Sequence, residues 1–192
     1  MTYSKPAPTG RWIVLTVLVL LSAALIGVRG FQPLTALAAS AARYLDTRHG
    51  PDRTVFDDDS PAVANLSGDL LDALRRAAED AAADGVEFVV NSGWRSTDEQ
   101  ERLLREAITK YGSEAAAARW VATPDTSPHV SGDAVDIGPT DAAAWLSRHG
   151  DRYGLCQIYR NEPWHYELRP DAAQDGCPPL YADPTHDPRM HR

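Results

Sequence analysis

The sequence has few cysteines and no excess of positive charge. Its 192 residues include two cysteines, and 19 Lys and Arg residues stand against 27 Asp and Glu residues, for a net charge of −8. Nothing resembles the basic stripe of a nucleic-acid-binding protein, so we expect no nucleic acid partner. No internal repeat is visible, and a chain of this length supports one domain of ordinary size once its ends are discounted.

Apolar sequence is concentrated near the amino terminus. Residues 12–28 are continuously apolar apart from Thr16 and Ser22, and Lys5 and Arg11 precede them. The pattern predicts a signal peptide or an N-terminal membrane anchor over residues 1–30, with the rest of the chain outside the cytoplasm. The run is long for a signal peptide, and the A-x-A sequence at 36–38 lies far beyond it, which favours an uncleaved anchor. We therefore expect an extracytoplasmic protein, anchored to the cytoplasmic membrane or secreted.

The rest of the chain divides into three parts by composition. Residues 31–65 are rich in Ala, Pro, Gly and Asp and predict a juxtamembrane linker. Its acidic run at 57–59 lacks the glycine and distal glutamate of a calcium loop, so we expect it to be solvated. Residues 66–180 form the predicted domain, and residues 181–192 predict a loose C-terminal tail, in which His186 and His191 are not expected to bind metal.

Within the domain, hydrophobic periodicity predicts alternating helices and short strands. Helices are expected at about 67–84, 97–111, 114–121 and 141–148, with Leu103, Leu104 and Ile108 facing inward in the second. Strands are expected at 86–90 and 132–137, and two more flank Tyr159 and His165. This pattern predicts an α+β fold in which helices pack against a small antiparallel sheet.

A set of polar residues, divided between two segments, indicates a metal site. Residues 127–136 read SPHVSGDAVD and residues 162–165 read EPWH. Together they supply two imidazoles and a carboxylate for a three-ligand metal site, and one spare carboxylate that could act as a base. Three protein ligands leave one position open, as in catalytic zinc sites, and both cysteines lie outside the set. The pattern therefore favours hydrolysis over a structural metal.

The spacing differs from the helical H-E-x-x-H motif, because here the two histidines lie on separate segments. We expect His129 on a loop and Asp136 on a strand. Residues three apart in a regular strand face opposite ways, so Glu162 and His165 can converge only if the chain kinks at Pro163. Taken singly, each residue has an ordinary alternative: a hydrogen-bonded surface histidine, or an aspartate that caps a turn.

The residues resemble those of a known family. The pattern S-x-H-x-x-G-x-A-x-D at 127–136, followed by E-x-W-H at 162–165, is similar to the VanY-type D-alanyl-D-alanine carboxypeptidases, which are zinc peptidases that trim bacterial cell-wall peptides. Upstream, S-x-x-R-S-x-x-x-Q at 92–100 is also similar. The resemblance covers about residues 65 to 170. Asp133 departs from it, because many relatives carry an apolar residue there, and this concerns the shape of the pocket.

The resemblance implies a role for each residue of the motif. The zinc ligands would be His129, Asp136 and His165, and the general base Glu162. Arg95 would stabilise charge on the substrate carbonyl, although its position just before the helix-capping sequence Ser96 to Glu99 also fits a surface arginine. Substrate contacts would come from Ser127 and Gln100. Trp164 is either a core residue or a wall of the pocket.

The function that follows is zinc-dependent removal of the terminal D-alanine from peptidoglycan stem peptides. An L,D-carboxypeptidase or an endopeptidase with the same fold remains open, because unassigned pocket residues choose the substrate. A non-catalytic, zinc-stabilised wall-binding module is a third possibility, and the spare carboxylate of Glu162 argues against it.

The two cysteines acquire a meaning from the predicted export. In an oxidising compartment, Cys156 and Cys177 are expected to form one disulfide that ties the C-terminal segment to the strand before Glu162. Two free thiols are the alternative. A disulfide closing a loop of this size would stabilise the fold by about 3 kcal/mol on the chain-entropy model.

Overall fold

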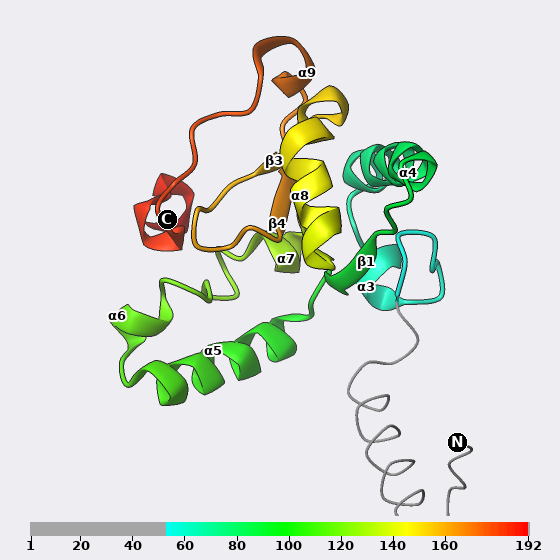
Figure 1. Ribbon diagram of the computed structural model, residues 1–192. Coiled ribbons are helices and arrows are strands. Elements are labelled where there is room, and N and C mark those ends of the chain that lie inside the picture. Colours follow the sequence, from blue (N-terminus) through cyan, green and yellow to red (C-terminus); the bar gives the residue numbers. More distant parts are fainter. Residues whose placement is uncertain (1–52, 192) are drawn as a thin grey trace, which may run out of the picture. The chain divides into compact units, whose positions relative to one another are not determined.

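The structure, a computed structural model, describes residues 53–191 and has the predicted α+β fold (Figure 1). Four antiparallel strands form one sheet in the order β1-β2-β4-β3. The strands are β1 (Val89–Ser92), β2 (Ala134–Gly138), β3 (Leu155–Gln157) and β4 (His165–Leu168). All are short, so the sheet provides a small platform on which helices and connecting loops are placed.

The two faces of the sheet differ in chemistry because side chains alternate along each strand. Val135, Ile137 and Tyr166 belong to the main hydrophobic core. The intervening residues Asp136 and His165 are directly opposite each other on β2 and β4. One face of the sheet therefore packs on helices, and the other carries the polar residues that the sequence analysis singled out.

Helix α4 (Gly68–Ala83) and helix α8 (Thr140–His149) supply the core against which the sheet packs. The buried residues of α4 recur at helical spacing, and they are Leu70, Ala73, Leu74, Ala77, Ala78 and Ala81. Small alanines allow this helix to approach the sheet closely. The hydroxyl of Tyr166 donates a hydrogen bond of 2.6 Å to the carbonyl of Ala143 and joins β4 to α8. Ser67 precedes α4 as expected, but its side chain makes no capping hydrogen bond.

Helix α5 (Thr97–Tyr111) has the predicted bounds, and Ser96 caps it by accepting a hydrogen bond from the Glu99 amide. Its packing differs from the prediction. The fully buried residues are Gln100 and Ala107, whereas the expected inward residues Leu103, Leu104 and Ile108 are only partly buried. The reason is that α5 pairs with the single-turn helix α6 (Glu114–Ala117), apart from α4 and α8 (Figure 1).

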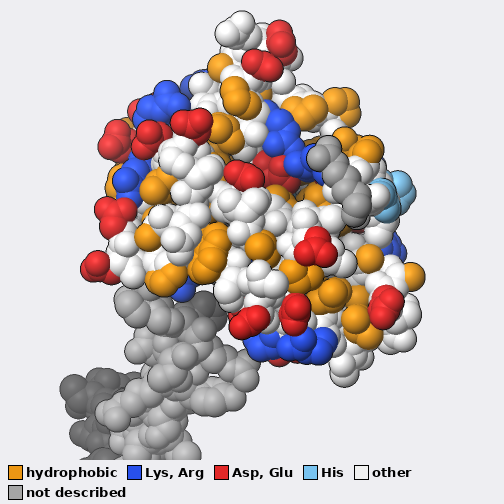
Figure 2. All heavy atoms as spheres, turned by 180° about the vertical axis from the view of Figure 1, so that it is seen from behind, with side chains coloured by type: hydrophobic (Ala, Val, Ile, Leu, Met, Phe, Trp, Pro, Cys, Tyr) orange, Lys and Arg blue, Asp and Glu red, His pale blue; other side chains and the backbone are white. Residues whose placement is uncertain are grey.

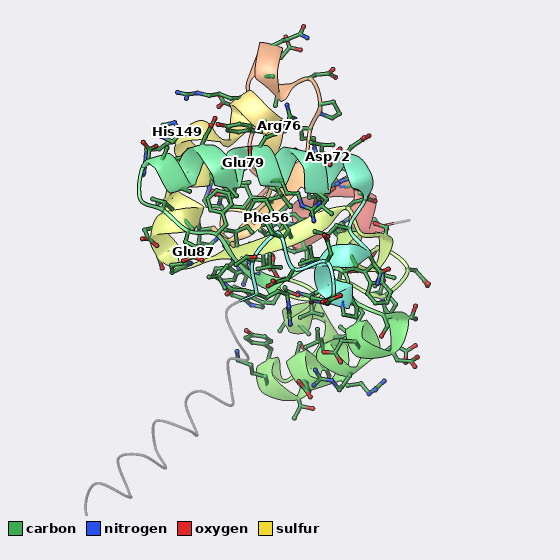
Figure 3. The ribbon with its side chains drawn as sticks, turned by 90° about the vertical axis from the view of Figure 1, so that its right-hand side faces the viewer. Phe56, Asp72, Arg76, Glu79, Glu87 and His149 are labelled. Atoms are coloured by element: carbon green, nitrogen blue, oxygen red, sulfur yellow. A yellow bond between two sulfur atoms is a disulfide. The ribbon has the colours of Figure 1, made fainter. Side chains whose placement is uncertain are left out.

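The folded unit begins earlier than predicted. Within residues 53–65, which the sequence analysis assigned to a linker, Val55 and Val63 are buried in the main core. Thr54 pairs with Val89 at the edge of the sheet, and helix α3 (Pro61–Ala64) follows. In Figure 3, Phe56 lies beneath α4, on which Asp72, Arg76 and Glu79 are labelled. The described part of the predicted linker is therefore part of the domain.

The chain end is also more ordered than predicted. After helix α9 (Ala172–Asp175), two 3-10 helices follow, η2 (Pro184–His186) and η3 (Pro188–His191). Asp183 and Asp187 are buried, and Tyr181 pairs with Tyr159 beside the β3–β4 connection (Figure 1). The prediction of a loose coil over 181–192 is therefore wrong for residues 181–191. The prediction failed because a proline-rich sequence gives no local sign of the tertiary contacts that hold these residues in place.

Other element boundaries shift locally. Strand β1 starts three residues later than expected, α6 ends at Ala117, and His129 lies on a short helix, α7 (Pro128–Ser131), where a loop was predicted. The 3-10 helix η1 (Gly150–Tyr153) connects α8 to β3. The predicted disulfide between Cys156 and Cys177 is present.

Two further observations concern the surface and the amino terminus. On the face shown in Figure 2, acidic and basic side chains are interspersed with hydrophobic ones. The predicted signal peptide or anchor over residues 1–30, like the first part of the linker, lies outside the described residues. Among residues 53–191, no helix has the length and apolarity needed to cross a membrane.

Candidate metal centre and active site

Strand pairing brings two of the predicted metal ligands together. Asp136 on β2 and His165 on β4 are directly opposite in the antiparallel register, on the face of the sheet turned away from the main core. Directly opposite residues on one face have Cβ atoms about 4.5 to 5.5 Å apart. Their proximity is therefore set by the sheet and not by a flexible loop.

The third predicted ligand, His129, is delivered by α7. Gly132 caps the end of this helix, and its φ of 83° lies in the left-handed region that favours glycine. A side chain at Gly132 would also meet the Asn65 carbonyl oxygen, which lies 2.5 Å from where its Cβ would stand. A glycine at this position lets the chain reverse tightly and enter β2 two residues later, at Ala134.

The three side chains meet at one point. The Nε2 atom of His129 and the Nδ1 atom of His165 lie 3.4 Å and 3.2 Å from the same oxygen, Oδ1 of Asp136. The two nitrogens are 3.3 Å apart. Ligand atoms of all three residues lie within 4.8 Å of one another, and the three residues are buried. This is a compact donor set of two nitrogens and one oxygen.

The remaining ring nitrogens are already occupied, which fixes the orientation of both imidazoles. His129 donates from Nδ1 to the Gly93 carbonyl at 2.8 Å, and His165 donates from Nε2 to Oε1 of Glu167 at 3.3 Å. Metal-binding histidines typically donate their second N–H to a carbonyl or carboxylate in this way. The residues therefore fit a zinc ion, whose preferred ligands are imidazole nitrogen and carboxylate oxygen.

Burial and charge act in opposite directions on the three donors. Burial disfavours a charged His129 and lowers its pKa. Burial also opposes ionisation of Asp136, but the neighbouring imidazoles outweigh it and hold the pKa of that carboxyl well below its usual range. For His165, hydrogen bonds to Asp136 and Glu167 overcome burial and raise the pKa to about 9. The cluster thus favours an ionised Asp136, the form that binds a metal, whereas a metal ion would have to displace a proton from His165.

Glu162 lies next to this set. It belongs to the turn that precedes β4, in which the His165 amide donates to the Glu162 carbonyl at 3.1 Å. The turn supplies the kink that the sequence analysis required, and Glu162 Oε2 lies 3.9 Å from Nδ1 of His165. Burial raises the pKa of Glu162 to about 7. A carboxyl group with a pKa near neutrality can both accept and release a proton.

Arg95 reaches the site from the loop between β1 and α5. Its Nε donates to Ser92 at 2.8 Å, Nη1 to Gln100 at 3.1 Å and Nη2 to Oδ2 of Asp136 at 3.0 Å. These bonds use three of the five N–H donors of a guanidinium group. Arg95 also lines the cavity beside the donor set, so it can face a bound molecule. The alternative of a surface arginine does not hold, because its side chain is 18% exposed.

A cavity of about 200 Å³ adjoins the donor set. Its wall includes the three donor residues, Glu162 and Arg95, and also residues from α5, from the loop before α7 and from residues 181–191. The remaining lining residues are Gln100, Leu103, Trp120, Val121, Ala122, Ser127, Pro128, Tyr159, Trp164, Pro184 and Met190.

The three predicted substrate contacts reach this cavity in different ways. Ser127 is buried, and its hydroxyl makes no capping hydrogen bond to α7. Trp164 is 39% exposed, which places it on the wall and not in the core. Gln100 is 1% exposed, and its two polar atoms bond to Arg95 and to the Ala122 carbonyl. These contacts make Gln100 a support for Arg95.

Sequence reasoning missed two residues behind the site. Glu167 is 1% exposed and accepts from His165, Arg169 and Arg189. Burial opposes its ionisation, but the hydrogen bonds from His165 and Arg189 hold its pKa well below the usual range. The i, i+2 spacing of His165 and Glu167 on a strand was a usable signal, since such residues share a face. No local pattern pointed to Arg189.

Comparison with known proteins gives a consistent result. Residues 64–171 match the family model VanY, described as D-alanyl-D-alanine carboxypeptidase. A D-alanyl-D-alanine carboxypeptidase of Enterococcus faecalis is 34% identical over 123 residues, which cover 51% of this chain and 43% of that protein. The matched region therefore spans less than half the length of this relative.

Solved structures resemble the chain over a similar region. The vancomycin resistance D,D-pentapeptidase VanY, in a variant complexed with Zn(II), is 29% identical with a TM-score of 0.53, covering 58% of this chain and 80% of that one. VanYB in complex with D-alanine-D-alanine is 28% identical with the same TM-score, covering 58% and 79%.

Proposed function

Because this chain belongs to the VanY family of D-alanyl-D-alanine carboxypeptidases, we propose that it is a zinc-dependent D,D-carboxypeptidase. Its substrate would be the peptidoglycan stem peptide, from which it would release the terminal D-alanine. The observation that carries the proposal is the meeting of three metal donors, a non-ligand carboxylate and a guanidinium at one cavity. A purely structural metal site needs neither of the last two groups.

His129, Asp136 and His165 would hold the zinc ion. When bound, zinc supplies a Lewis acid that polarises a carbonyl and lowers the pKa of a water molecule. The structural support for this assignment is the orientation of the donors. Each imidazole has one nitrogen engaged with Gly93 or Glu167 and the other directed at Asp136.

Glu162 would move the protons. Its carboxylate lies beside the donor set but is 3.9 Å from the nearest imidazole nitrogen, so it can remain free for a water molecule. In the proposed reaction, Glu162 takes a proton from the attacking water and passes it to the amine of the departing D-alanine. Burial favours both halves of this transfer, because it raises the pKa of Glu162 to about 7.

Arg95 would stabilise the negative charge that develops on the scissile carbonyl oxygen. Ser92, Gln100 and Asp136 hold its guanidinium in place before any substrate arrives. Preorganised donors of this kind are typically worth about 3 to 4 kcal/mol in the transition state. Two N–H groups of Arg95 are left for the substrate once these three bonds are counted.

Substrate contacts and cellular location complete the proposal. Ser127 offers a hydroxyl to the peptide at the cavity wall, and Trp164 offers an aromatic surface. The apolar segment at 12–28 would hold the protein at the membrane or direct its secretion, which gives access to the wall outside the cytoplasm.

The direct test is hydrolysis of defined wall peptides. Purified protein would be incubated with stem peptides ending in D-Ala-D-Ala, with and without a chelator, and the products identified by mass spectrometry. We expect loss of a single D-alanine that stops on chelation and returns with zinc. A second test uses the variant Glu162→Gln, which removes the proposed base. Its matched control is Glu87→Gln, because Glu87 is exposed and lies outside the cavity lining.

Other products would redirect the proposal. Cleavage of a tetrapeptide ending in a single D-alanine, with pentapeptide left intact, would indicate an L,D-carboxypeptidase. Cleavage only of cross-linked dimers would indicate an endopeptidase. Zinc-dependent wall binding with no chelator-sensitive cleavage of any peptide would leave the binding module.

A further inference from the structure

The C-terminal segment (residues 181–191) is attached to the back of the candidate site. Its backbone pairs with residues 158–160, through bonds from the Arg160 amide to Tyr181 and from the Tyr181 amide to Ile158. Pro184 and Met190 from this segment form part of the cavity wall. The segment therefore contacts the site directly, although no motif residue lies in it.

Within this segment, Arg189 is connected to one proposed metal ligand, His165, through a single residue, Glu167. Its Nη1 donates to Oε2 of Glu167 at 2.6 Å, and its Nη2 donates to Oε1 at 3.2 Å. Oε1 is also the oxygen that accepts from Nε2 of His165. The guanidinium thus contacts both oxygens of the carboxylate that orients His165.

We propose that Arg189 is a positioning residue for the metal site: it fixes the Glu167 carboxylate, and Glu167 in turn fixes the His165 ring. A carboxylate gripped at both oxygens cannot rotate about its terminal bond, so Oε1 stays aimed at His165. The proposal rests on the zinc site of the proposed function.

Arg169 also contacts Glu167 but cannot do the same work. It donates to Oε2 alone, at 2.7 Å, and its other terminal nitrogen donates to the Leu168 carbonyl. With Arg189 removed, Oε1 keeps only its bond to His165. With Arg189 in place Glu167 is 1% exposed, and a buried charge that loses a partner is strongly disfavoured.

Arg189 is held in place by a second carboxylate, that of Asp187. Its Nε lies 3.0 Å from both oxygens of Asp187, and Asp187 is fully buried. Asp187 accepts from the hydroxyl of Tyr159 at 3.0 Å, and the Tyr159 ring centre lies 5.1 Å from that of His165. The chain of contacts therefore returns to His165, which explains why a segment distant in sequence can fix its orientation.

The test compares two arginines that anchor the same segment. Arg189→Met removes the contact to Glu167. Arg119→Met is the matched control, because Arg119 binds Asp183 of the segment at 2.9 Å and has no contact with Glu167. Zinc affinity would be measured by competition with a chromophoric chelator, together with kcat, KM and the absorption spectrum of the cobalt(II)-substituted protein.

We expect Arg189→Met to weaken zinc binding by about 10- to 100-fold, in the range typical of lost outer-sphere partners. At saturating zinc we expect a lower kcat, an unchanged KM and an altered cobalt spectrum. Arg189→Lys keeps the charge but can grip only one oxygen at a time, so it should fall between Met and wild type. Arg119→Met should match wild type in zinc affinity and spectrum.

Three results would overturn the inference. One is wild-type zinc affinity in Arg189→Met, or in Arg189→Lys if the Met variant does not fold. The second is an equal loss in Arg119→Met, which would mean that docking of the segment matters and not the Glu167 contact. The third is absence of zinc binding by the wild-type protein, which would contradict the proposed function itself and is seen before any variant is made.

Discussion

The residues of the site come from strands and from the segments that connect helices and strands, and the two groups carry different chemistry. Asp136 and His165 stand opposite each other on adjacent central strands, β2 and β4. Glu162 and Arg95 stand on connections, one in the turn before β4 and the other in the loop after β1. The strands fix two of the three residues proposed to bind the metal, and the third, His129, lies on α7. The connections carry the residues proposed to act on the substrate.

This division follows from the different requirements of a metal ligand and of a residue that meets the substrate. A metal site needs donor atoms held to within a few tenths of an ångström, which hydrogen-bonded strands provide. A residue that meets the substrate must face open space, and loops reach the surface more readily than strands do. Arg95 combines the two, because it sits on a loop but is held by Ser92, Gln100 and Asp136.

The largest loss of zinc and activity is expected from a substitution on a strand. His165→Ala removes one of three donors, so we expect loss of bound zinc, measured by elemental analysis, and loss of detectable hydrolysis. Full zinc content with normal hydrolysis would show that His165 is not a ligand and would remove the distinction between the two parts of the site.

The next effect is expected from the loop side. Arg95→Met should keep one zinc per chain while kcat falls by about 10²- to 10³-fold, the usual result of removing an oxyanion donor. Steady-state kinetics on a D-Ala-D-Ala peptide, with metal content measured on the same sample, would check this. If zinc were lost as in His165→Ala, Arg95 would belong with the metal site through its contact to Asp136.

A third test concerns the covalent tie between β3 and the segment after α9. Replacing Cys177 with Ala opens a disulfide that links residues 21 apart. We expect the free energy of unfolding to fall by about 3 kcal/mol, because the unfolded chain gains the freedom of an open loop. Denaturant unfolding gives the value, and the matched control is wild-type protein under reducing conditions, which should behave alike. An unchanged stability in both would show that the disulfide does not support this region.

The smallest effect is expected from the support of Arg95. Gln100→Met keeps the volume of the side chain but removes the bonds to Arg95 and to the Ala122 carbonyl. We expect kcat to fall about 10-fold, because the lost bond to Arg95 is one buried hydrogen bond of about 1.5 kcal/mol, with little change in KM. A rise in KM with kcat unchanged would favour the substrate contact that the motif implies.

The sequence predicted the parts of the fold that local patterns specify. Helix α5 has the predicted bounds because Ser96 and Gly112 cap its ends. The polar residues of 127–136 and 162–165 do meet, because the alternation in β2 and β4 puts Asp136 and His165 on one face.

What the sequence did not predict depends on contacts between distant segments. Val55 and Val63 looked like linker residues, and only the tertiary structure shows them in the main core. Arg189 sits in a proline-rich end with no periodicity, and its contact with Glu167 spans 22 residues. Likewise, Gln100 belongs to a motif, but its contact with Arg95 decides its role only once the loop is folded.

In the proposed site, the metal donors and the base are separate groups in one cavity. The most direct test is Glu162→Gln, with zinc content and D-alanine release measured on the same sample. We expect about one zinc per chain and turnover reduced by at least about 10²-fold, the usual contribution of a general base. Wild-type turnover, or loss of zinc together with activity, would contradict it.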